Sequence, residues 1–401
     1  MHRRKLLLIP FLAVAGLLSA AVAGASPAPH ESRTVAAKAT TKDHSVCKHA
    51  HRARSRCFAI RVDHLHRGRV RHESSPIGYG PSDLQAAYSL PSASAGSGQT
   101  VAVVDAYDDP DAARDLATYR AQYGLPACAT SNGCFRKVDQ TGGHDYPDPD
   151  GGWGQEISLD LDMVSAVCPH CHVLLVEADS ASMANLGAAV DTAVRLGASA
   201  VSNSYGGPDA SDRSYGRYYH HPGVAVVASA GDSGYGVAYP ASSKWVTAVG
   251  GTTLRRSSAA RGFSESAWSN SGSGCSTLNI ASWQPAATTG CSGRAEADVS
   301  AVADPATGVA VYDSYAFDNT SGWLTFGGTS ASSPIIAGVY ALAGNETQTG
   351  DGASYLWSHH SGLHDVTGGS NGTCSTEQWC TARRGWDGPT GWGTPDGTSG
   401  F

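Results

Sequence analysis

Short apolar runs rich in valine and alanine, separated by segments with helical spacing, constrain the fold of this chain most strongly. The runs are typical of buried strands and lie at residues 100–105, 172–177, 200–205, 223–229 and 245–249. Segments of helical pattern stand among them, at residues 109–123, 155–167 and 182–196. Apolar strands interleaved with helices indicate a parallel sheet covered on both faces. We therefore expect an α/β fold with a doubly wound, mostly parallel sheet, whose functional residues follow the carboxyl ends of strands.

The amino-terminal residues have the pattern of an export signal. Residues 2–5 are basic, residues 6–23 form an apolar run, and small residues follow at Ala21, Ala23 and Ala25. This order predicts a signal peptide over residues 1–25 and a secreted, extracellular protein. A membrane anchor is the weaker alternative, because the apolar run is marginal for crossing a bilayer and no later stretch is longer.

Ten cysteines agree with export. They fall into close neighbours along the chain, namely Cys47 and Cys57, Cys128 and Cys134, Cys168 and Cys171, Cys275 and Cys291, and Cys374 and Cys380. An even count with short spacing favours local disulfides in a secreted chain. Cys168 and Cys171 could instead hold a metal with His170 or His172, although no second ligand pair has the spacing of a zinc site.

Charge divides the 401 residues unevenly. Residues 30–75 carry 11 Lys and Arg against 4 Asp and Glu, whereas residues 76–401 carry 14 against 31, a net charge of −17 with neutral His. So acidic a body repels nucleic acid, and we exclude that class of partner. We expect residues 26–75 to be a basic leader, either a short pro-segment that docks and is removed or a flexible tail. Residues 76–401 would form one functional domain, acting as a monomer.

The segment from Phe326 to Pro334 contains Gly-Gly-Thr-Ser330 and precedes an apolar helix at residues 335–343. Two glycines allow a tight turn and a close backbone approach. Ser330 would then lie at a helix start, where free N–H groups and the helix dipole favour a developing oxyanion. The alternative is a serine that only caps an ordinary helix.

Two acidic segments could serve such a serine. Glu156 and Asp160 are four residues apart on one helical face, and no Lys or Arg occurs from residue 155 to residue 167. Like charges so placed raise the pKa of one partner. Asp232 follows the apolar run 226–229 within Gly-Asp-Ser-Gly, at the carboxyl end of an expected strand. The simpler interpretations are a solvated acidic face and a turn aspartate.

These three segments, in this order, resemble the sedolisin family of serine-carboxyl peptidases, which shares the subtilisin fold. The resemblance extends over residues 76–401 and implies a subtilisin-like sheet. It implies that Ser330 attacks the peptide carbonyl, that Glu156 is the general base, that Asp160 orients Glu156, and that protonated Asp232 donates to the oxyanion. The implied reaction is hydrolysis of peptides or proteins through an acyl-enzyme, with an optimum at roughly pH 3 to 5 from ordinary carboxyl pKa values. Residues 26–75 stand where the family has a longer pro-domain.

The resemblance also implies a Ca²⁺ site near the carboxyl terminus. The carboxylates of Asp365 and Asp387 and the carbonyls of Val366, Arg383 and Gly385 would form a cage of hard oxygen ligands. Arg383 stands where the family usually has glycine, a change that only a carbonyl ligand tolerates. The alternative is a glycine-rich tail without a metal.

Two further hypotheses remain for comparison. Asp105 ends the first expected strand, and His144 could join it with Ser330 in a subtilisin-like triad. However, His144 lies in a loop of Gly, Asp and Pro, and no His-Gly-Thr-His helix is present. The other hypothesis is an inactive binding module, against which the joint presence of Ser330, Glu156, Asp160 and Asp232 argues.

Overall fold

The computed structural model describes residues 40–47, 54–66, 69–70, 73–345 and 352–401. The expected signal peptide at residues 1–25 lies outside the described residues, as do residues 26–39 and 48–53 of the expected leader. Within the described ranges, no helix combines the length and the apolar character that a membrane span requires.

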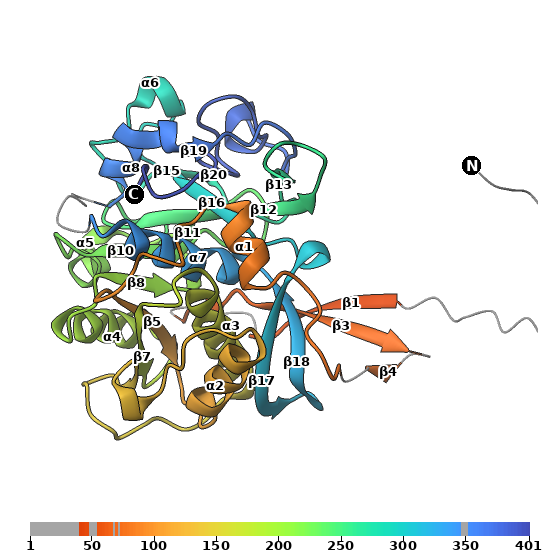
Figure 1. Cartoon of the computed structure of the whole chain (residues 1–401). Helices are drawn as coiled ribbons and strands as arrows, with labels where there is room; N and C mark the ends of the chain where they lie inside the picture. The colour runs from red at the N-terminus through yellow and green to blue at the C-terminus, as the bar shows by residue number, and fades with distance from the viewer. Residues whose placement is uncertain (1–39, 48–53, 67–68, 71–72, 346–351) are drawn as a thin grey trace, which may run out of the picture. The chain divides into compact units, whose positions relative to one another are not determined.

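A mostly parallel sheet forms the centre of the unit that residues 39–401 build (Figure 1). Among the described residues it has eight strands, in the order β13-β12-β10-β8-β5-β7-β6, with β16 also paired to β12. The strands are β5 (Thr100–Ala106), β6 (Phe135–Asp139), β7 (His172–Ala178), β8 (Ala200–Asn203), β10 (Ala225–Ser229), β12 (Thr247–Arg256), β13 (Phe263–Ala267) and β16 (Val299–Val302). All neighbouring pairs are parallel except β12 with β13. The expected α/β fold with a mostly parallel sheet is therefore confirmed.

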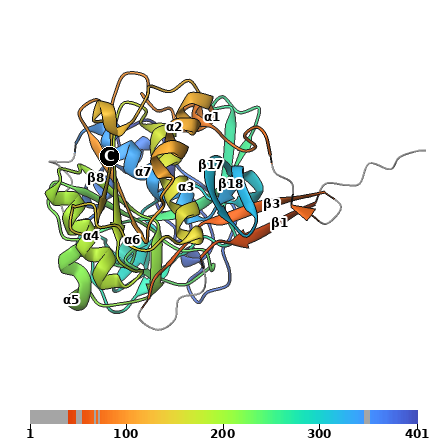
Figure 2. The ribbon, with the colours of Figure 1, turned by 90° about the horizontal axis from the view of Figure 1, so that it is seen from below.

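Helices cover the sheet on both faces, which explains why central strands such as β5, β7 and β10 are almost entirely buried. Figure 2 shows α3 (Gly151–Val167) and α7 (Thr329–Ala343) together on one side and α4 (Met183–Arg195) on the other. On α4, buried Leu186, Ala189, Val190 and Ala193 recur at helical spacing and form the face that packs on the sheet. Helix α2 (Ala112–Gln122) packs outside α3, so that α3 is buried on nearly all sides.

Helix α3 begins four residues before the predicted start at residue 155. The Asp150 carboxylate caps it by accepting hydrogen bonds from the N–H groups of Gly152 and Trp153, both at 3.0 Å. These bonds satisfy two of the donors that a helix start leaves free. The Gly151-Gly152 pair hides this start in the sequence, because glycine is unfavourable inside a helix.

Part of the expected leader belongs to the same compact unit as the rest of the chain. It contributes to an antiparallel sheet in the order β1-β3-β18-β17, with β4 also paired to β3. The strands are β1 (Thr40–Ser45), β3 (Ile60–His66), β4 (Arg69–Val70), β17 (Val309–Phe317) and β18 (Thr320–Gly327). Strand β18 ends three residues before Ser330, so this sheet leads the chain directly into α7. Through the pairing of β1 with β3 and of β3 with β18, the expected leader therefore contributes strands to this unit.

Short elements and disulfides complete the described structure. The elements are β2 (Arg56–Cys57), α1 (Pro81–Ala87), β9 (Tyr205–Pro208), α5 (Asp212–Tyr215), β11 (Ala238–Tyr239), β14 (Gly274–Ser276), α6 (Ala286–Thr289), β15 (Arg294–Glu296), α8 (Ser354–His359), β19 (Leu363–His364) and β20 (Thr394–Pro395). All five expected local disulfides are present. Cys168 and Cys171 are bonded to each other, so the alternative of a metal site at this pair is wrong.

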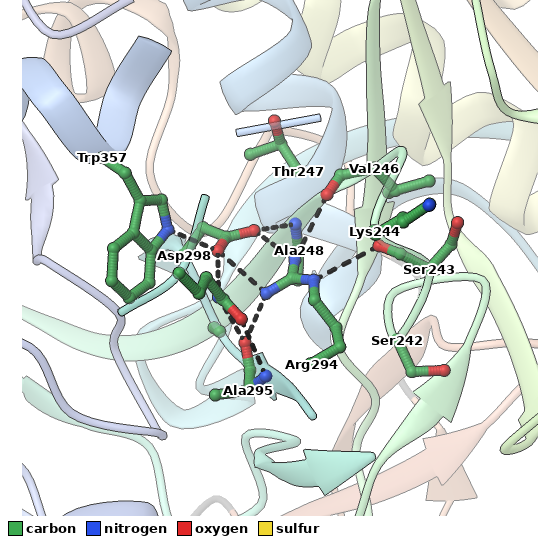
Figure 3. A network of polar contacts seen from close by, with 12 residues as sticks. Ser242, Ser243, Lys244, Val246, Thr247, Ala248, Arg294, Ala295, Asp298 and Trp357 are labelled. Carbon is green, nitrogen blue, oxygen red and sulfur yellow. Dashed lines mark hydrogen bonds and ion pairs between the residues drawn. The ribbon is translucent and has the colours of Figure 1, made fainter. Parts of the chain in front are cut away.

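A buried ion pair joins β15 to the sheet beside β12 (Figure 3). The guanidinium of Arg294 contacts the carboxylate of Asp298 at 2.5 Å and 3.0 Å, and both side chains are fully buried. Asp298 also accepts hydrogen bonds from the Ala248 N–H at 2.8 Å and the Trp357 indole N–H at 2.7 Å. Arg294 donates to the carbonyl oxygens of Ser243 and Val246, each at 3.2 Å. Each charge therefore has the partners that burial requires.

We expect Arg294→Met to lower the free energy of unfolding by about 3–5 kcal/mol, because it leaves the Asp298 carboxylate buried and unpaired. Urea denaturation would measure the loss. Arg256→Met is the matched control: the Arg256 side chain is 66% exposed in its ion pair with Asp83, and its loss should cost less than about 1 kcal/mol. Equal losses for the two variants would contradict this account of the buried pair.

Candidate active site

Ser330 lies in the first turn of α7, at the carboxyl edge of the parallel sheet. Its side chain is buried, and its hydroxyl donates to the Ser204 carbonyl oxygen at 3.1 Å. Pro334 lies inside this helix and has no N–H for the Ser330 carbonyl oxygen, which lies 3.4 Å from the Ser204 hydroxyl oxygen. The expected helix start is confirmed, although α7 begins six residues before the predicted 335.

Gly328 precedes this helix in a conformation that glycine favours, with φ of 91°. A Cβ at this position would lie 1.9 Å from the Phe58 carbonyl oxygen and 2.7 Å from Asp232 Oδ2. Because Gly328 has no Cβ, the Phe58 carbonyl oxygen can lie close to its backbone and near Asp232.

The two acids of α3 point into the same buried space as Ser330. Glu156 Oε2 accepts the Ala59 N–H at 2.9 Å, while Glu156 Oε1 has no partner among the described residues. One turn later, both oxygens of Asp160 accept from the Ser204 hydroxyl at 2.8 Å. Both acids are fully buried, so the alternative of a solvated acidic face is wrong.

Burial dominates the electrostatics of this acid pair. Desolvation raises the pKa of Glu156 well above its ordinary value, and the charges of Asp105 and Asp232 raise it further, while the nearby Ser330 hydroxyl and the hydrogen bond from the Ala59 N–H lower it. The pKa of Asp160 is raised by desolvation and by the charges of Asp105 and Glu156. Burial raises the pKa of Asp105 to about 8, and neither of its oxygens has a hydrogen-bond partner in the described structure. These three carboxyl groups together therefore retain protons at pH values at which ordinary carboxyl groups are ionised.

Asp232 follows β10 and faces the start of α7. Its Oδ1 accepts from the N–H and the hydroxyl of Thr329, both at 2.8 Å. Its Oδ2 is buried without a partner among the described residues. Burial raises the pKa of Asp232 to about 7, so below that pH Oδ2 can carry a proton and donate it to an oxyanion. An aspartate that only stabilises a turn would not need to be buried with one oxygen unpaired, so the simpler interpretation of Asp232 does not account for its surroundings.

Three neighbouring strands place these groups. Asp105 lies near the end of β5, Ser204 follows β8, and Asp232 lies three residues beyond β10. Since the carboxyl ends of parallel strands meet at one edge, the expectation from the sheet is confirmed. The sequence interpretation missed Ser204 and Thr329. Ser204 could have been found from its place at the end of an apolar run.

His144 does not join this site. It forms a hydrogen bond with the Tyr146 hydroxyl at 3.2 Å, in the loop that follows β6. Since the Asp105 carboxylate has no partner among the described residues, the triad of Asp105, His144 and Ser330 is not assembled.

The residues proposed for Ca²⁺ lie close together near the carboxyl terminus. Asp387 is buried and accepts the Arg383 N–H at 2.9 Å, and Asp365 accepts the Gly385 N–H at 3.0 Å. Burial raises the pKa of Asp387 to about 7, and the Asp365 charge adds to this effect. Within the described ranges, no three His, Cys, Asp or Glu side chains gather to hold a metal, so a cation here would also need carbonyl oxygens such as that of Val366.

Comparisons with known proteins agree with this geometry. Residues 147–370 match the model of the subtilase family. The chain is 32% identical to kumamolisin of Bacillus sp. (strain MN-32) over 81% of its own length and 63% of that protein. It is 29% identical to sedolisin of Pseudomonas sp. (strain 101) over 80% of its length and 60% of that protein. The chain therefore spans about three fifths of these curated relatives.

A solved structure of Pseudomonas sedolisin, a serine-carboxyl proteinase in complex with pseudo-iodotyrostatin, is similar to this fold with a TM-score of 0.68. The similarity covers 80% of this chain and 96% of that one, at 27% sequence identity. The likeness thus extends over nearly all of that solved chain.

Proposed function

The chain belongs to the subtilases and, among them, to the sedolisin family, and from that premise we propose that it is a serine-carboxyl peptidase that hydrolyses peptides or proteins through an acyl-enzyme. One observation carries the proposal: Ser330, Glu156 and Asp232 all lie against the same two-residue segment, Phe58 and Ala59. Ser330 Oγ lies 3.1 Å from the Phe58 nitrogen, and Glu156 Oε2 lies 2.9 Å from the Ala59 nitrogen. The free Oδ2 of Asp232 faces the space that holds the Phe58 carbonyl oxygen.

The proposed reaction uses one nucleophile, one base and one neutral acid. The Ser330 hydroxyl turns from the Ser204 carbonyl toward Glu156, gives it a proton and attacks the substrate carbonyl carbon. Asp232, protonated at Oδ2, donates to the oxyanion that forms. Glu156 then returns the proton to the leaving nitrogen, and water hydrolyses the acyl-enzyme by the same route. Asp160, held by the Ser204 hydroxyl, is a positioning residue for Glu156.

We also propose that the protein is exported and acts as a monomer outside the cell. The five disulfides support export, because such bonds persist in oxidising compartments. The proposed catalytic groups all come from one chain, so the reaction needs no residue from a second copy.

A structural Ca²⁺ is proposed at Asp365 and Asp387, with the carbonyls of Val366, Arg383 and Gly385. Two neighbouring carboxylates, one of them buried, fit a hard divalent cation, because their mutual repulsion would be relieved by its charge. The cation would hold the loops together and take no part in peptide hydrolysis.

We expect Ser330→Ala and Glu156→Gln each to reduce kcat for an acid-denatured protein substrate by at least about a thousandfold, since one removes the nucleophile and the other the base. His144→Ala is the control and should retain wild-type activity, because His144 lies outside the site. Release of peptides at pH 4 would be measured. A variant lacking Glu156 that stays active while His144→Ala fails would favour the subtilisin-like triad instead.

Activity should fall as pH rises through the Asp232 pKa of about 7, and it should also fall at the lowest pH values, where Glu156 becomes protonated and can no longer accept the Ser330 proton. The fall at higher pH follows from the role of Asp232: the protonated group donates to the oxyanion, whereas the ionised group repels it. Asp232→Asn is the test variant, because an amide can donate at every pH. Its kcat/KM should be lower at pH 4 but should no longer decline near pH 7. A wild-type maximum above neutrality would contradict the carboxyl mechanism.

Chelation should destabilise the protein if Ca²⁺ binds only the folded state. At a free concentration about 100 times the Kd, the ion would contribute about 2.7 kcal/mol. Excess chelator should therefore lower Tm by about 3–4 °C, and added Ca²⁺ should restore it. Asp387→Asn should start from the lower Tm and show no response to chelator. If excess chelator left the melting curve of the wild type unchanged, the proposed Ca²⁺ site would be contradicted.

A further inference from the structure

The two most exposed large apolar side chains in the described part of the chain lie two residues apart. Ile280 is 67% exposed and Leu278 is 52% exposed, whereas the next such side chains reach only 37–38%. Both belong to residues 277–280, which follow β14 and which we call the apolar loop. Asn279 stands between them and is buried. A single exposed apolar residue is ordinary, but two in one short loop indicate a surface that binds a partner.

Hydrogen bonds of Asn279 fix the apolar loop to the body of the protein. Its Nδ2 donates to the carbonyl oxygens of Ala210 at 2.8 Å and Ser242 at 3.0 Å. Its Oδ1 accepts the Asp212 N–H at 2.8 Å. Because the loop is held in this way, little backbone freedom would be lost when its exposed side chains bind a partner.

The apolar loop is also joined to the end of β9. Asp209 directly follows this strand, and its Oδ2 accepts the Ser276 hydroxyl at 2.8 Å. Ser276 Oγ in turn accepts the N–H groups of Leu278 at 3.1 Å and Asn279 at 3.3 Å. The end of β9 and the apolar loop therefore form one hydrogen-bonded unit.

The other end of β9 lies beside the nucleophile. The strand directly follows Ser204, whose carbonyl oxygen accepts the Ser330 hydroxyl at 3.1 Å. Along one edge β9 pairs with β11, and along the other, residues 56–57 pair antiparallel with residues 205–206. The next residue, Phe58, has its nitrogen 3.1 Å from Ser330 Oγ. An extended chain can therefore pair with β9 and still reach the nucleophile.

A substrate paired in this register would run toward the apolar loop. With the residue before the cut bond in the place of Phe58, the fifth residue before that bond would lie opposite Pro208 and the seventh opposite Ala210. Since Asn279 holds Ala210, the seventh residue and its neighbours would meet the apolar loop. Six steps of about 3.3 Å place this contact roughly 20 Å from the cut bond.

We propose that the apolar loop binds apolar side chains of the substrate around the seventh residue before the cut bond, and so directs the enzyme to internal bonds of unfolded polypeptides. The proposal rests on the proposed peptidase activity. An unfolded chain exposes apolar side chains and can lie extended along β9, whereas a folded protein buries them. A peptide with only three or four residues before the cut bond ends before the loop. Burial of Leu278 and Ile280 against the substrate would strengthen binding without contact to the reacting bond.

The test compares two peptides that both have Phe before the cut bond and differ only at the seventh and eighth residues before it, which are Leu in one peptide and Ser in the other. Cleavage by the full chain at pH 4 would be followed by liquid chromatography and mass spectrometry. We expect a KM about tenfold lower for the Leu peptide with an equal kcat, because the loop binds ground state and transition state alike. A third peptide, which begins at the fourth residue before the cut bond, should have the KM of the Ser peptide.

Leu278→Ser combined with Ile280→Ser should abolish the difference between the Leu and Ser peptides and leave the KM of the shortest peptide unchanged. Both side chains are exposed, so Tm should stay within about 2 °C of the wild type. Ile77→Ser is the matched control and should keep the preference for the Leu peptide. Ile77 is 38% exposed but lies beside β18, where its carbonyl oxygen accepts the Thr325 hydroxyl at 2.8 Å.

Denatured casein, assayed in parallel, separates the possible failures. A wild type that digests casein but cuts the Leu and Ser peptides equally well overturns this inference and leaves the peptidase function standing. A loop variant that keeps the preference, or a wild type that releases only short peptides from free amino termini, has the same consequence. A chain that cuts neither the peptides nor casein overturns both the inference and the proposed function.

Discussion

The desolvation of several carboxyl groups beside one serine is the constraint on which the site depends. Glu156, Asp160, Asp105 and Asp232 are buried in one region, and burial raises the pKa of each. Four such charges cannot coexist in a space of low polarity, so protons must remain there. A retained proton is also what the chemistry requires, because only a neutral acid can donate to an oxyanion. The same burial thus costs stability at neutral pH and, in the proposed mechanism, supplies the protonated Asp232 that the reaction uses at acid pH.

The leader segment is part of this electrostatic arrangement. Phe58 and Ala59 cover Ser330 and Glu156, and their N–H groups meet both side chains. Departure of this segment would readmit water, which opposes the rise in these pKa values, and would remove Arg56, whose charge lowers the pKa of Asp232. Burial of Asp232 beneath this segment therefore favours its protonated form, which is the form that the proposed mechanism uses.

Much of the fold could be predicted from periodicity alone. The apolar runs at residues 100–105 and 172–177 correspond to β5 and β7, because a sheet buried on both faces leaves no polar alternation. The starts of helices were harder to predict from the sequence. Helix α7 begins at Thr329, since Asp232 accepts the Thr329 N–H from a segment about 100 residues away, which no local pattern reveals.

The sequence by itself determined the sheet and the local disulfides, because both depend on residue types at short spacing, and its motifs marked Ser330, Glu156, Asp160 and Asp232 as candidates. Only the tertiary structure decided what surrounds them. Ser204 joins Asp160 and Ser330 through parallel pairing of β8 with β5 and β10, and Phe58 reaches Ser330 across 272 positions of the chain. The burial of each carboxyl group is the combined effect of many such residues that are distant in the sequence. The raised carboxyl pKa values, and the peptide bond presented to Ser330, therefore exist only once the chain has folded.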